Sequence, residues 1–225
     1  MLTAIIVAAG SSRRVGFDKL LESIAGKPVI AHTIDAFERS KAVTEIVVVV
    51  REDRLPEFEK ALRSSKKVRK LTAGGEHRQD SVRAGLQHLG ENVQYVAVHD
   101  AARPLITPEQ IERVFDECRA HGAAAMAEPI IDTLKRTDEN LHVTDSVDRD
   151  QLYAMQTPQI FWRDLLEEAY RTVFAQQRRI TDEVSAVELL GRKVILVANN
   201  DFNFKLTYER DLRLAEIILR ERERK

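Results

Sequence analysis

Short runs of apolar residues recur along this chain, and segments with helical periodicity separate them. Each run is nearly continuous and rich in β-branched residues, which is typical of strands that are buried on both faces of a parallel sheet. The runs cover residues 2–7, 46–50, 95–98, 123–130 and 194–197. Their alternation with helices predicts an α/β fold with a doubly wound, mostly parallel, Rossmann-like sheet. Such sheets bind ligands beyond the carboxyl ends of their strands.

Several of the intervening helices have recognisable starts. Pro28 begins a helix that continues through Phe37, and Asp53 is expected to cap the next helix. The run Thr107-Pro108-Glu109-Gln110 combines a capping box with a proline at the first helical position. The last helix is expected from about residue 207 to the C-terminus.

Residues 132–148 break this rhythm, because they are polar, alternate only weakly and follow a strand with no helical pattern. We interpret them as a projecting β-arm. No internal repeat, low-complexity tract or flexible linker divides the chain. We therefore expect a single domain over residues 1–225, from which the arm extends.

The composition is that of an ordinary globular protein. Of 225 residues, 44% are apolar and 32% are charged, which excludes disordered, collagenous and membrane-embedded classes. The 35 Lys and Arg residues nearly balance the 36 Asp and Glu residues, so no overall charge attracts the chain to nucleic acid or to a membrane surface. The first apolar run is too short for a membrane span and lacks the basic flank of a signal peptide, so we expect a cytoplasmic protein. The one cysteine, Cys118, falls on the apolar stripe of a predicted helix and is expected in the core.

The segment after the first strand has groups suited to phosphate chemistry. The strand leads into the small residues Ala8-Ala9-Gly10 and then into three cations, Arg13, Arg14 and Lys19. Backbone N–H groups can approach a phosphate chain closely there, and the cations can offset its charge. The spacing fits neither a dinucleotide-binding glycine fingerprint nor a P-loop. A solvated loop is the alternative interpretation.

Two further runs lie where the predicted sheet would place a ligand. The fourth strand ends in His99-Asp100-Ala101-Ala102-Arg103-Pro104, which would be explained by a salt bridge if it stood alone. The run Gly74-Gly75-Glu76-His77-Arg78-Gln79-Asp80-Ser81 follows another short strand, and Ser81 lies near the start of a helix. A hydroxyl at that position is either a helix cap or a ligand contact.

Together, these residues resemble a known family. The matching positions occur in order over nearly the whole chain: Ala8-Ala9-Gly10, Arg14, Gly75, Ser81, the 99–104 run, Asp132-Thr133, Asp148-Arg149, Thr157-Pro158-Gln159, Thr181-Asp182-Glu183 and Lys205. This ordered set resembles the 2-C-methyl-D-erythritol 4-phosphate cytidylyltransferases of the non-mevalonate isoprenoid route. The two alanines after Asp100 are more similar to this family than to its near relative, ribitol-5-phosphate cytidylyltransferase.

The resemblance implies a nucleotidyltransferase that transfers CMP from CTP to the phosphate of methylerythritol phosphate and releases pyrophosphate, with the help of Mg²⁺. It implies that Arg14 and Lys19 stabilise the charge that develops at the α-phosphate, and that Arg149 and Lys205 position the phosphate of the second substrate. The positions implied to hold the nucleotide are Ala8, Ala9, Gly10, Gly75 and Ser81. The other positions implied to shape the site of the second substrate are Asp100, Ala101, Arg103, Thr133, Thr157 and Thr181. The direct ligands of the metal are not implied.

Members of the family are homodimers in which the arm reaches into the partner subunit. The resemblance therefore implies that the arm, at about residues 132–148, exchanges between subunits and that Thr133 and Arg149 act in trans. It implies no nucleic-acid or membrane partner. One departure concerns Lys19, because the family commonly has Pro-Lys-Gln where this chain has Asp18-Lys19-Leu20 after a shorter loop. Lys27 is the competing lysine, although Gly26-Lys27-Pro28 is more typical of a turn.

The residue types agree with this chemistry on independent grounds. A phosphate monoester has its second pKa near ~6, so the nucleophile is mostly a dianion at neutral pH and needs no general base. His99 is therefore interpreted as structural. Bringing a dianion to a triphosphate requires cations, a metal and alignment of the reacting oxygens. Two alternatives stay open: the same chemistry on another polyol phosphate or with another nucleotide such as UTP, and a non-catalytic nucleotide-binding module on the same fold.

Overall fold

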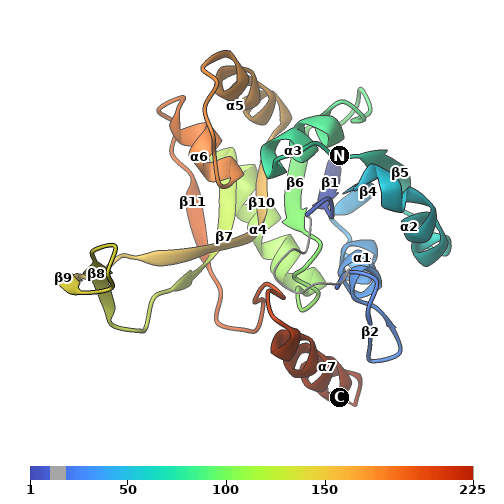
Figure 1. The fold of residues 1–225 in the computed structure, drawn as a ribbon. Coiled ribbons are helices and arrows are strands. Elements are labelled where there is room, and N and C mark those ends of the chain that lie inside the picture. Colours follow the sequence, from blue (N-terminus) through green and yellow to red (C-terminus); the bar gives the residue numbers. More distant parts are fainter. Residues whose placement is uncertain (11–18, 225) are drawn as a thin grey trace.

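The computed structural model describes residues 1–10 and 19–224, and a seven-stranded sheet forms its centre (Figure 1). In space, the strands lie in the order β11 (Ile195–Ala198), β7 (Ala123–Pro129), β10 (Tyr153–Trp162), β6 (Tyr95–Asp100), β1 (Leu2–Val7), β4 (Val43–Val50) and β5 (Val68–Ala73). Neighbouring strands are parallel except at β10, which runs antiparallel to both β6 and β7. The predicted doubly wound, mostly parallel sheet is confirmed.

Helices cover both faces of the sheet because successive side chains of a strand point to opposite sides. On β1, Ala4 and Ile6 pack into one hydrophobic core, whereas Ile5 packs into the other. The first core includes residues of α1 (Val29–Arg39), α2 (Leu55–Leu62), α4 (Pro108–His121) and α7 (Glu209–Glu223). The second includes residues of α3 (Arg78–Leu86), α5 (Arg163–Ala175) and α6 (Glu183–Glu188). This two-sided burial explains why the strands read as continuous apolar runs.

The helix starts test the local sequence signals one by one. The capping box of α4 is confirmed, because the Thr107 hydroxyl accepts the backbone N–H of Gln110 at 3.3 Å and the Gln110 side chain accepts that of Thr107 at 2.9 Å. The predicted cap at Asp53 is wrong. Asp53 lies inside a short 3₁₀ helix, η1 (Glu52–Arg54), and its carboxylate accepts from Arg51 at 2.9 Å. With its carboxylate engaged there, α2 begins only after this turn and has no side-chain cap.

Two other elements begin close to their predicted positions. Pro28 ends the short strand β3 (Lys27–Pro28), which pairs with β2 (Ser23–Ile24), and α1 follows it directly. The last helix, α7, begins at Glu209, two residues after the predicted start. Within residues 1–10 and 19–224, none of the helices combines the length and the apolar character that crossing a bilayer requires.

The apolar pattern did not predict β10, which lies between β6 and β7 near the middle of the sheet. Proline cannot donate to a strand ladder, so Thr157-Pro158-Gln159 argues against a central strand. The structure accommodates it because the pairing of β10 with β7 shifts register between Met155 and Gln159. The Thr157–Pro158 peptide bond is cis.

The remaining predictions concern Cys118 and the arm. Cys118 is fully buried in the first core, and burial raises the pKa of its thiol to about 12, so its role in packing is confirmed. The predicted arm contains β8 (Leu134–Thr137) and β9 (Val143–Val147), which pair antiparallel as a separate two-stranded sheet. Figure 1 shows this hairpin standing well away from the central sheet.

Candidate functional site

A cleft of about 760 Å³ lies at the carboxyl ends of the central strands. Its lining includes segments that directly follow β1 and β5, the end of β6, and part of the connection between β11 and α7. The strand order reverses at β1, with β4 and β5 on one side and β6 on the other. Such a switch point is where open α/β sheets bind ligands.

The cleft brings together many of the predicted site residues from segments far apart in the sequence. The predicted positions that line it are Ala8, Ala9, Gly10, Lys19, Gly75, Ser81, Asp100 and Lys205. Leu206 donates its backbone N–H to Ala102 at 2.8 Å, which holds the neighbouring Lys205 beside the end of β6. The carboxyl ends of the strands therefore bring the described parts of the runs after β1 and β6 together at the cleft, as predicted.

Two glycines allow the backbone to pack closely at one side of the cleft. A Cβ on Gly74 would lie 2.5 Å from the Ser81 hydroxyl and 2.6 Å from the Cβ of Ala9, and a Cβ on Gly75 would lie 2.3 Å from that of Asp80. Larger residues at these positions would push α3 away from the end of β1. The glycines thus keep backbone and small side chains along this wall of the cleft.

Ser81 lines the cleft but does not cap α3. The helix is capped at His77, where the carboxylate of Asp80 accepts the backbone N–H at 2.9 Å. Ser81 lies one turn into the helix, is buried, and donates its hydroxyl to the carbonyl of His77 at 3.3 Å. The structure therefore excludes the interpretation of Ser81 as the cap of α3.

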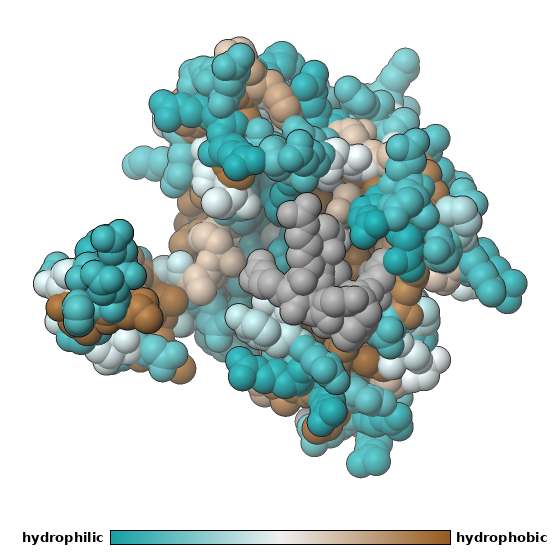
Figure 2. Space-filling view, viewed as in Figure 1, coloured by the Kyte–Doolittle hydropathy of each residue, from teal (hydrophilic) through white to brown (hydrophobic). Residues whose placement is uncertain are grey.

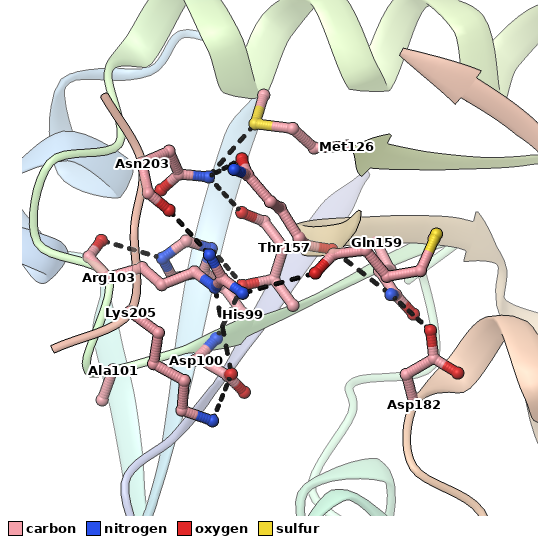
Figure 3. Close-up of polar contacts among 12 residues, drawn as sticks. His99, Asp100, Ala101, Arg103, Met126, Thr157, Gln159, Asp182, Asn203 and Lys205 are labelled. Carbon is pink, nitrogen blue, oxygen red and sulfur yellow. Dashed lines mark hydrogen bonds and ion pairs between the residues drawn. The ribbon is translucent and has the colours of Figure 1, made fainter. Parts of the chain in front are cut away.

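Asp100 at the end of β6 is the centre of a cluster of charges. Its carboxylate lies 3.1 Å from Nε of Arg78, 2.7 Å from Nζ of Lys205 and 4.0 Å from Nε of Arg103. Burial alone would raise the pKa of Asp100, but the charges of Arg78, Lys205 and Arg103 hold it well below its usual range. Figure 3 shows Lys205 reaching this carboxylate. Asp100 is therefore ionised throughout the physiological range.

Arg78 joins this cluster to a buried carboxylate on α6. Its guanidinium donates to both oxygens of Glu183, at 2.7 and 3.0 Å, and Tyr170 donates its hydroxyl to the same side chain at 2.8 Å. Glu183 is fully buried, and the side chain of Arg78 is 24% exposed. Although burial lowers the pKa of Arg78, the charges of Glu183 and Asp100 raise it well above its ordinary value.

Sequence analysis did not assign a role to Arg78 or Glu183, although both fall within quoted runs. They are separated by 105 positions, and no local pattern pairs two residues at that distance. The only available signal was the type of residue, a charge at the start of each of two helices. Their contact became visible only once the sheet order was known.

His99 lies in a buried hydrogen-bond network behind the cleft. One ring nitrogen, Nε2, lies 3.2 Å from the carbonyl of Arg103, and Nδ1 lies 3.1 Å from the hydroxyl of Thr157. That hydroxyl also accepts the backbone N–H of Asp100 at 3.1 Å. These partners assign a neutral ring that donates from Nε2 and accepts at Nδ1. Burial lowers the pKa of His99 to about 3, which agrees with its predicted structural role.

Three predicted residues, Ala101, Arg103 and Thr157, lie behind the cleft lining instead of in it. The backbone of Ala101 donates to Val7 at 3.0 Å, which ties the end of β6 to β1. Arg103 donates to the carbonyl of Asn203 at 2.7 Å, as drawn in Figure 3. Arg103 supports the cluster around Asp100 with its charge, and Thr157 supports it with its hydroxyl.

The other predicted positions lie elsewhere or outside the described part of the chain. Thr133 and Arg149 are exposed at the base of the arm, where Arg149 donates to the carbonyl of Ile131. Thr181 is exposed just before Asp182, whose carboxylate caps α6. Arg13 and Arg14, the two arginines that follow the first strand, lie outside the described residues.

The structure distinguishes Lys19 from Lys27, the two lysines considered for the site. Lys19 lines the cleft, whereas Lys27 lies in β3 and forms an ion pair with Asp35. Only the first of these lysines is placed for a role in the site. Lys19 therefore lines the cleft although Asp18-Lys19-Leu20 departs from the family's usual Pro-Lys-Gln.

Divalent metal binding has few candidate protein ligands. Nowhere in the described residues do three His, Cys, Asp or Glu side chains come together as a metal-binding group. Asp100 and Glu76 are the acidic residues that line the cleft in the part of the chain that is described. Carboxylate oxygen is nevertheless a donor that Mg²⁺ prefers.

Comparison with known proteins gives one consistent result. A model of the family described as 2-C-methyl-D-erythritol 4-phosphate cytidylyltransferase matches residues 2–221. A relative with that name from Bacillus mycoides is 40% identical over 223 residues, which cover 97% of this chain and 98% of the relative. One from Halalkalibacterium halodurans is 39% identical over 227 residues, covering 99% of each. The crystal structure of 4-diphosphocytidyl-2C-methyl-D-erythritol synthase from Anaerococcus prevotii superimposes with a TM-score of 0.86 at 29% identity and 98% coverage of both chains.

The pKa of His99 leads to a prediction about stability at acidic pH. In the unfolded chain, His99 binds a proton below a pKa of about 6.5, whereas in the folded chain it stays neutral until about pH 3. His99 therefore lowers the unfolding free energy as the pH falls below 6.5. His99→Gln removes this term. We expect the unfolding free energy of wild type, relative to the variant, to fall by about 1.4 kcal/mol per pH unit below pH 6.

Urea denaturation of both proteins at pH 7.5, 6.0 and 5.0 measures this difference. Other titrating groups are common to both proteins and cancel in the comparison. A difference that does not change with pH would mean that His99 titrates alike in the folded and unfolded chains.

Proposed function

Because this chain belongs to the 2-C-methyl-D-erythritol 4-phosphate cytidylyltransferase family, we propose that its cleft is the site where CMP passes from CTP to the phosphate of 2-C-methyl-D-erythritol 4-phosphate. The products are 4-diphosphocytidyl-2-C-methyl-D-erythritol and pyrophosphate. The observation that carries the proposal is the cleft at the sheet's switch point, where matched residues from distant segments meet. Residues 1–225 act as one nucleotidyltransferase domain, with residues 132–148 as its dimerisation arm.

The nucleotide is held along the wall formed after β1 and β5. Ala8, Ala9 and Gly10 follow β1, while Gly75 and Ser81 come from the segment that leads into α3. The close packing at Gly74 and Gly75 supports this assignment, because a small-residue wall leaves room for a ligand against backbone N–H groups. The buried Ser81 hydroxyl adds one polar group to this wall.

Charge stabilisation at the α-phosphate is the role of Lys19 and Arg14. The acceptor phosphate needs no base, since its second pKa of ~6 leaves it a dianion at neutral pH. The neutral, buried state of His99 supports this reading, because that ring has no access to a substrate proton. The remaining work is to offset repulsion between two anions and to align the attacking and leaving oxygens.

The acceptor site forms around Asp100 and Lys205. The side chain of Lys205 is 45% exposed and points at a carboxylate that is 10% exposed, so an incoming phosphate competes with Asp100 for this ammonium. Arg78 stays fixed by Glu183 and keeps Asp100 compensated when Lys205 turns to substrate. The other residues of this site are Ala101, Arg103, Thr157 and Thr181 and, through the arm, Thr133 and Arg149.

Mg²⁺ is the metal that fits this donor set. Mg²⁺ is typically held by one or two carboxylates together with substrate phosphates, and the cleft offers the ionised carboxylate of Asp100. When bound, Mg²⁺ would offset part of the triphosphate charge. Asp100 is the residue of this chain that would hold it, directly or through water.

A homodimer with exchanged arms completes the site. The arm region exposes large apolar side chains, including Ile131 at 78% and Leu141 at 81%, and Figure 2 shows apolar surface on the hairpin. A two-stranded hairpin on its own cannot bury such residues. A two-fold dimer gives each arm the surface of the other subunit and brings Thr133 and Arg149 to the partner's cleft.

A substrate screen tests the proposed activity. Pyrophosphate release is measured for four nucleoside triphosphates, each with methylerythritol phosphate and with ribitol 5-phosphate, with and without Mg²⁺. We expect turnover only with CTP, methylerythritol phosphate and Mg²⁺. Equal or faster turnover with ribitol 5-phosphate would assign another polyol phosphate, and no pyrophosphate with any pair would indicate a non-catalytic module.

Lys19→Ala should lower kcat by a factor on the order of 10² or more, because removing one preorganised group that stabilises developing charge has an effect of this size. The affinity for CTP should fall less. The matched control is Lys27→Ala, which removes a lysine paired with Asp35 outside the cleft and should leave kcat near wild type. A normal kcat for Lys19→Ala would remove this residue from the mechanism.

Mixing two inactive variants tests the shared site. Arg149→Ala and Lys205→Ala are each expected to be nearly inactive, yet a mixed dimer with exchanged arms has one intact site and one site with both defects. That dimer should have about half the wild-type activity, and an equilibrated equal mixture about a quarter.

The control is a mixture of Lys19→Ala with Lys205→Ala. Each site takes both Lys19 and Lys205 from a single subunit. Every site in that mixture therefore lacks one of the two lysines, and activity should not recover. If the Arg149 and Lys205 variants exchange subunits, as followed by mass-tagged chains, without any recovery, then Arg149 acts in its own subunit.

A further inference from the structure

Arg179 lines the cleft, but none of the roles described so far involves it. It lies on the connection between α5 and α6, and its side chain is exposed. Exposed arginines are common on protein surfaces and carry no information by themselves. Two features distinguish this one: how its backbone is held and how its charge is compensated.

The backbone on both sides of Arg179 is fixed by one buried side chain of α3. The amide group of Gln79 donates to the carbonyl of Arg178 at 3.1 Å, and its oxygen accepts the backbone N–H of Ile180 at 3.0 Å. Gln79 is buried and belongs to the first turn of the helix. The connection cannot move away from α3 without breaking two partly buried hydrogen bonds, so Arg179 is held at the cleft.

The guanidinium of Arg179 is oriented by His77. Its Nη2 lies 2.6 Å from Nε2 of the imidazole, and His77 itself lines the cleft and caps α3. The guanidinium of arginine only donates, so the imidazole nitrogen is the acceptor in this contact. The contact places the guanidinium beside His77, which belongs to the segment that contains Gly75 and Ser81.

The charge of Arg179 is not offset by a carboxylate among the described residues, where no ion pair involves it. By contrast, Arg78 is paired with Glu183 and Asp100, and Lys205 is paired with Asp100. The cleft therefore presents an arginine whose charge is available to a bound anion. Arg178, the neighbouring residue, is also an exposed cation but does not line the cleft.

We infer that Arg179 binds the triphosphate chain of CTP from the side of the α5–α6 connection. The inference rests on the proposed function and adds a substrate contact to it. CTP is favoured over the acceptor phosphate because Arg179 is held by His77 and Gln79, on the same segment that supplies Gly75 and Ser81 to the nucleotide wall. The acceptor site is instead proposed around Lys205 and Asp100, which pair with each other.

The test compares Arg179→Ala with wild type by calorimetric titration of CTP and by steady-state kinetics. We expect CTP to bind about tenfold more weakly, since a lost charge-assisted hydrogen bond has an effect of this order. The KM for methylerythritol phosphate should stay within about twofold of wild type. Arg179→Lys should recover part of the CTP affinity, because an ammonium keeps the charge without the planar fork of donors.

The matched control is Arg178→Ala, which removes the same charge from the same connection and should leave both substrates unaffected. Unchanged CTP binding by Arg179→Ala would overturn the inference, as would a raised KM for methylerythritol phosphate alone or an equal effect of Arg178→Ala. Wild-type turnover in the substrate screen reports separately on the proposed function, so the two can fail independently.

Discussion

The ion cluster around Asp100 is the constraint on which the arrangement of this cleft depends. Asp100 ends β6, and its partners Arg78 and Lys205 come from α3 and from the connection after β11. Through Glu183, the same cluster reaches α6 on one face of the sheet. A buried carboxylate costs much free energy unless it is paired, and removing one partner of a buried pair typically destabilises a protein by ~3 to 5 kcal/mol. The cluster therefore fixes the relative positions of the segments that form the cleft.

The strand β10 supports this cluster from the opposite side with polar groups. Gln159 accepts the backbone N–H groups of Glu183 and Val184, both at 3.1 Å, and donates to Asp182 at 2.9 Å. These bonds hold the first turn of α6, so that Glu183 meets Arg78. Two residues before Gln159 on the same strand, the hydroxyl of Thr157 accepts the backbone N–H of Asp100 at the end of β6. Gln159 and Thr157 are tolerated in the middle of the sheet because both have hydrogen-bond partners.

The sequence predicted the parts of this molecule that depend on local pattern. Strands that are buried on both faces are nearly continuous apolar runs, so β1 was found with its exact bounds, and the capping box marked the start of α4 correctly. The prediction of a helix cap at Asp53 was wrong because the carboxylate of Asp53 accepts a hydrogen bond from Arg51. The strand β10 was missed because Pro158 is acceptable only where the register shifts, and that shift depends on the neighbouring strand. The site followed the same division: the segments after β1 and β6 were found from their composition, whereas the pairing of Arg78 with Glu183 depends on which strands are neighbours.

The pairing of two cleft cations, Arg78 and Lys205, also bears on how a chain with a net charge of −1 can bind two polyanionic substrates. A cleft of unpaired cations would attract any anion, because long-range attraction depends on charge and hardly on shape. In this cleft, Arg78 is paired with Glu183 and Asp100, and in the proposed function Lys205 leaves Asp100 to bind the substrate phosphate. Binding then depends on the difference between two pairings, so a dianion placed correctly gains more than a monoanion placed loosely. The cluster that holds the segments together thus also sets the condition that a substrate phosphate must meet.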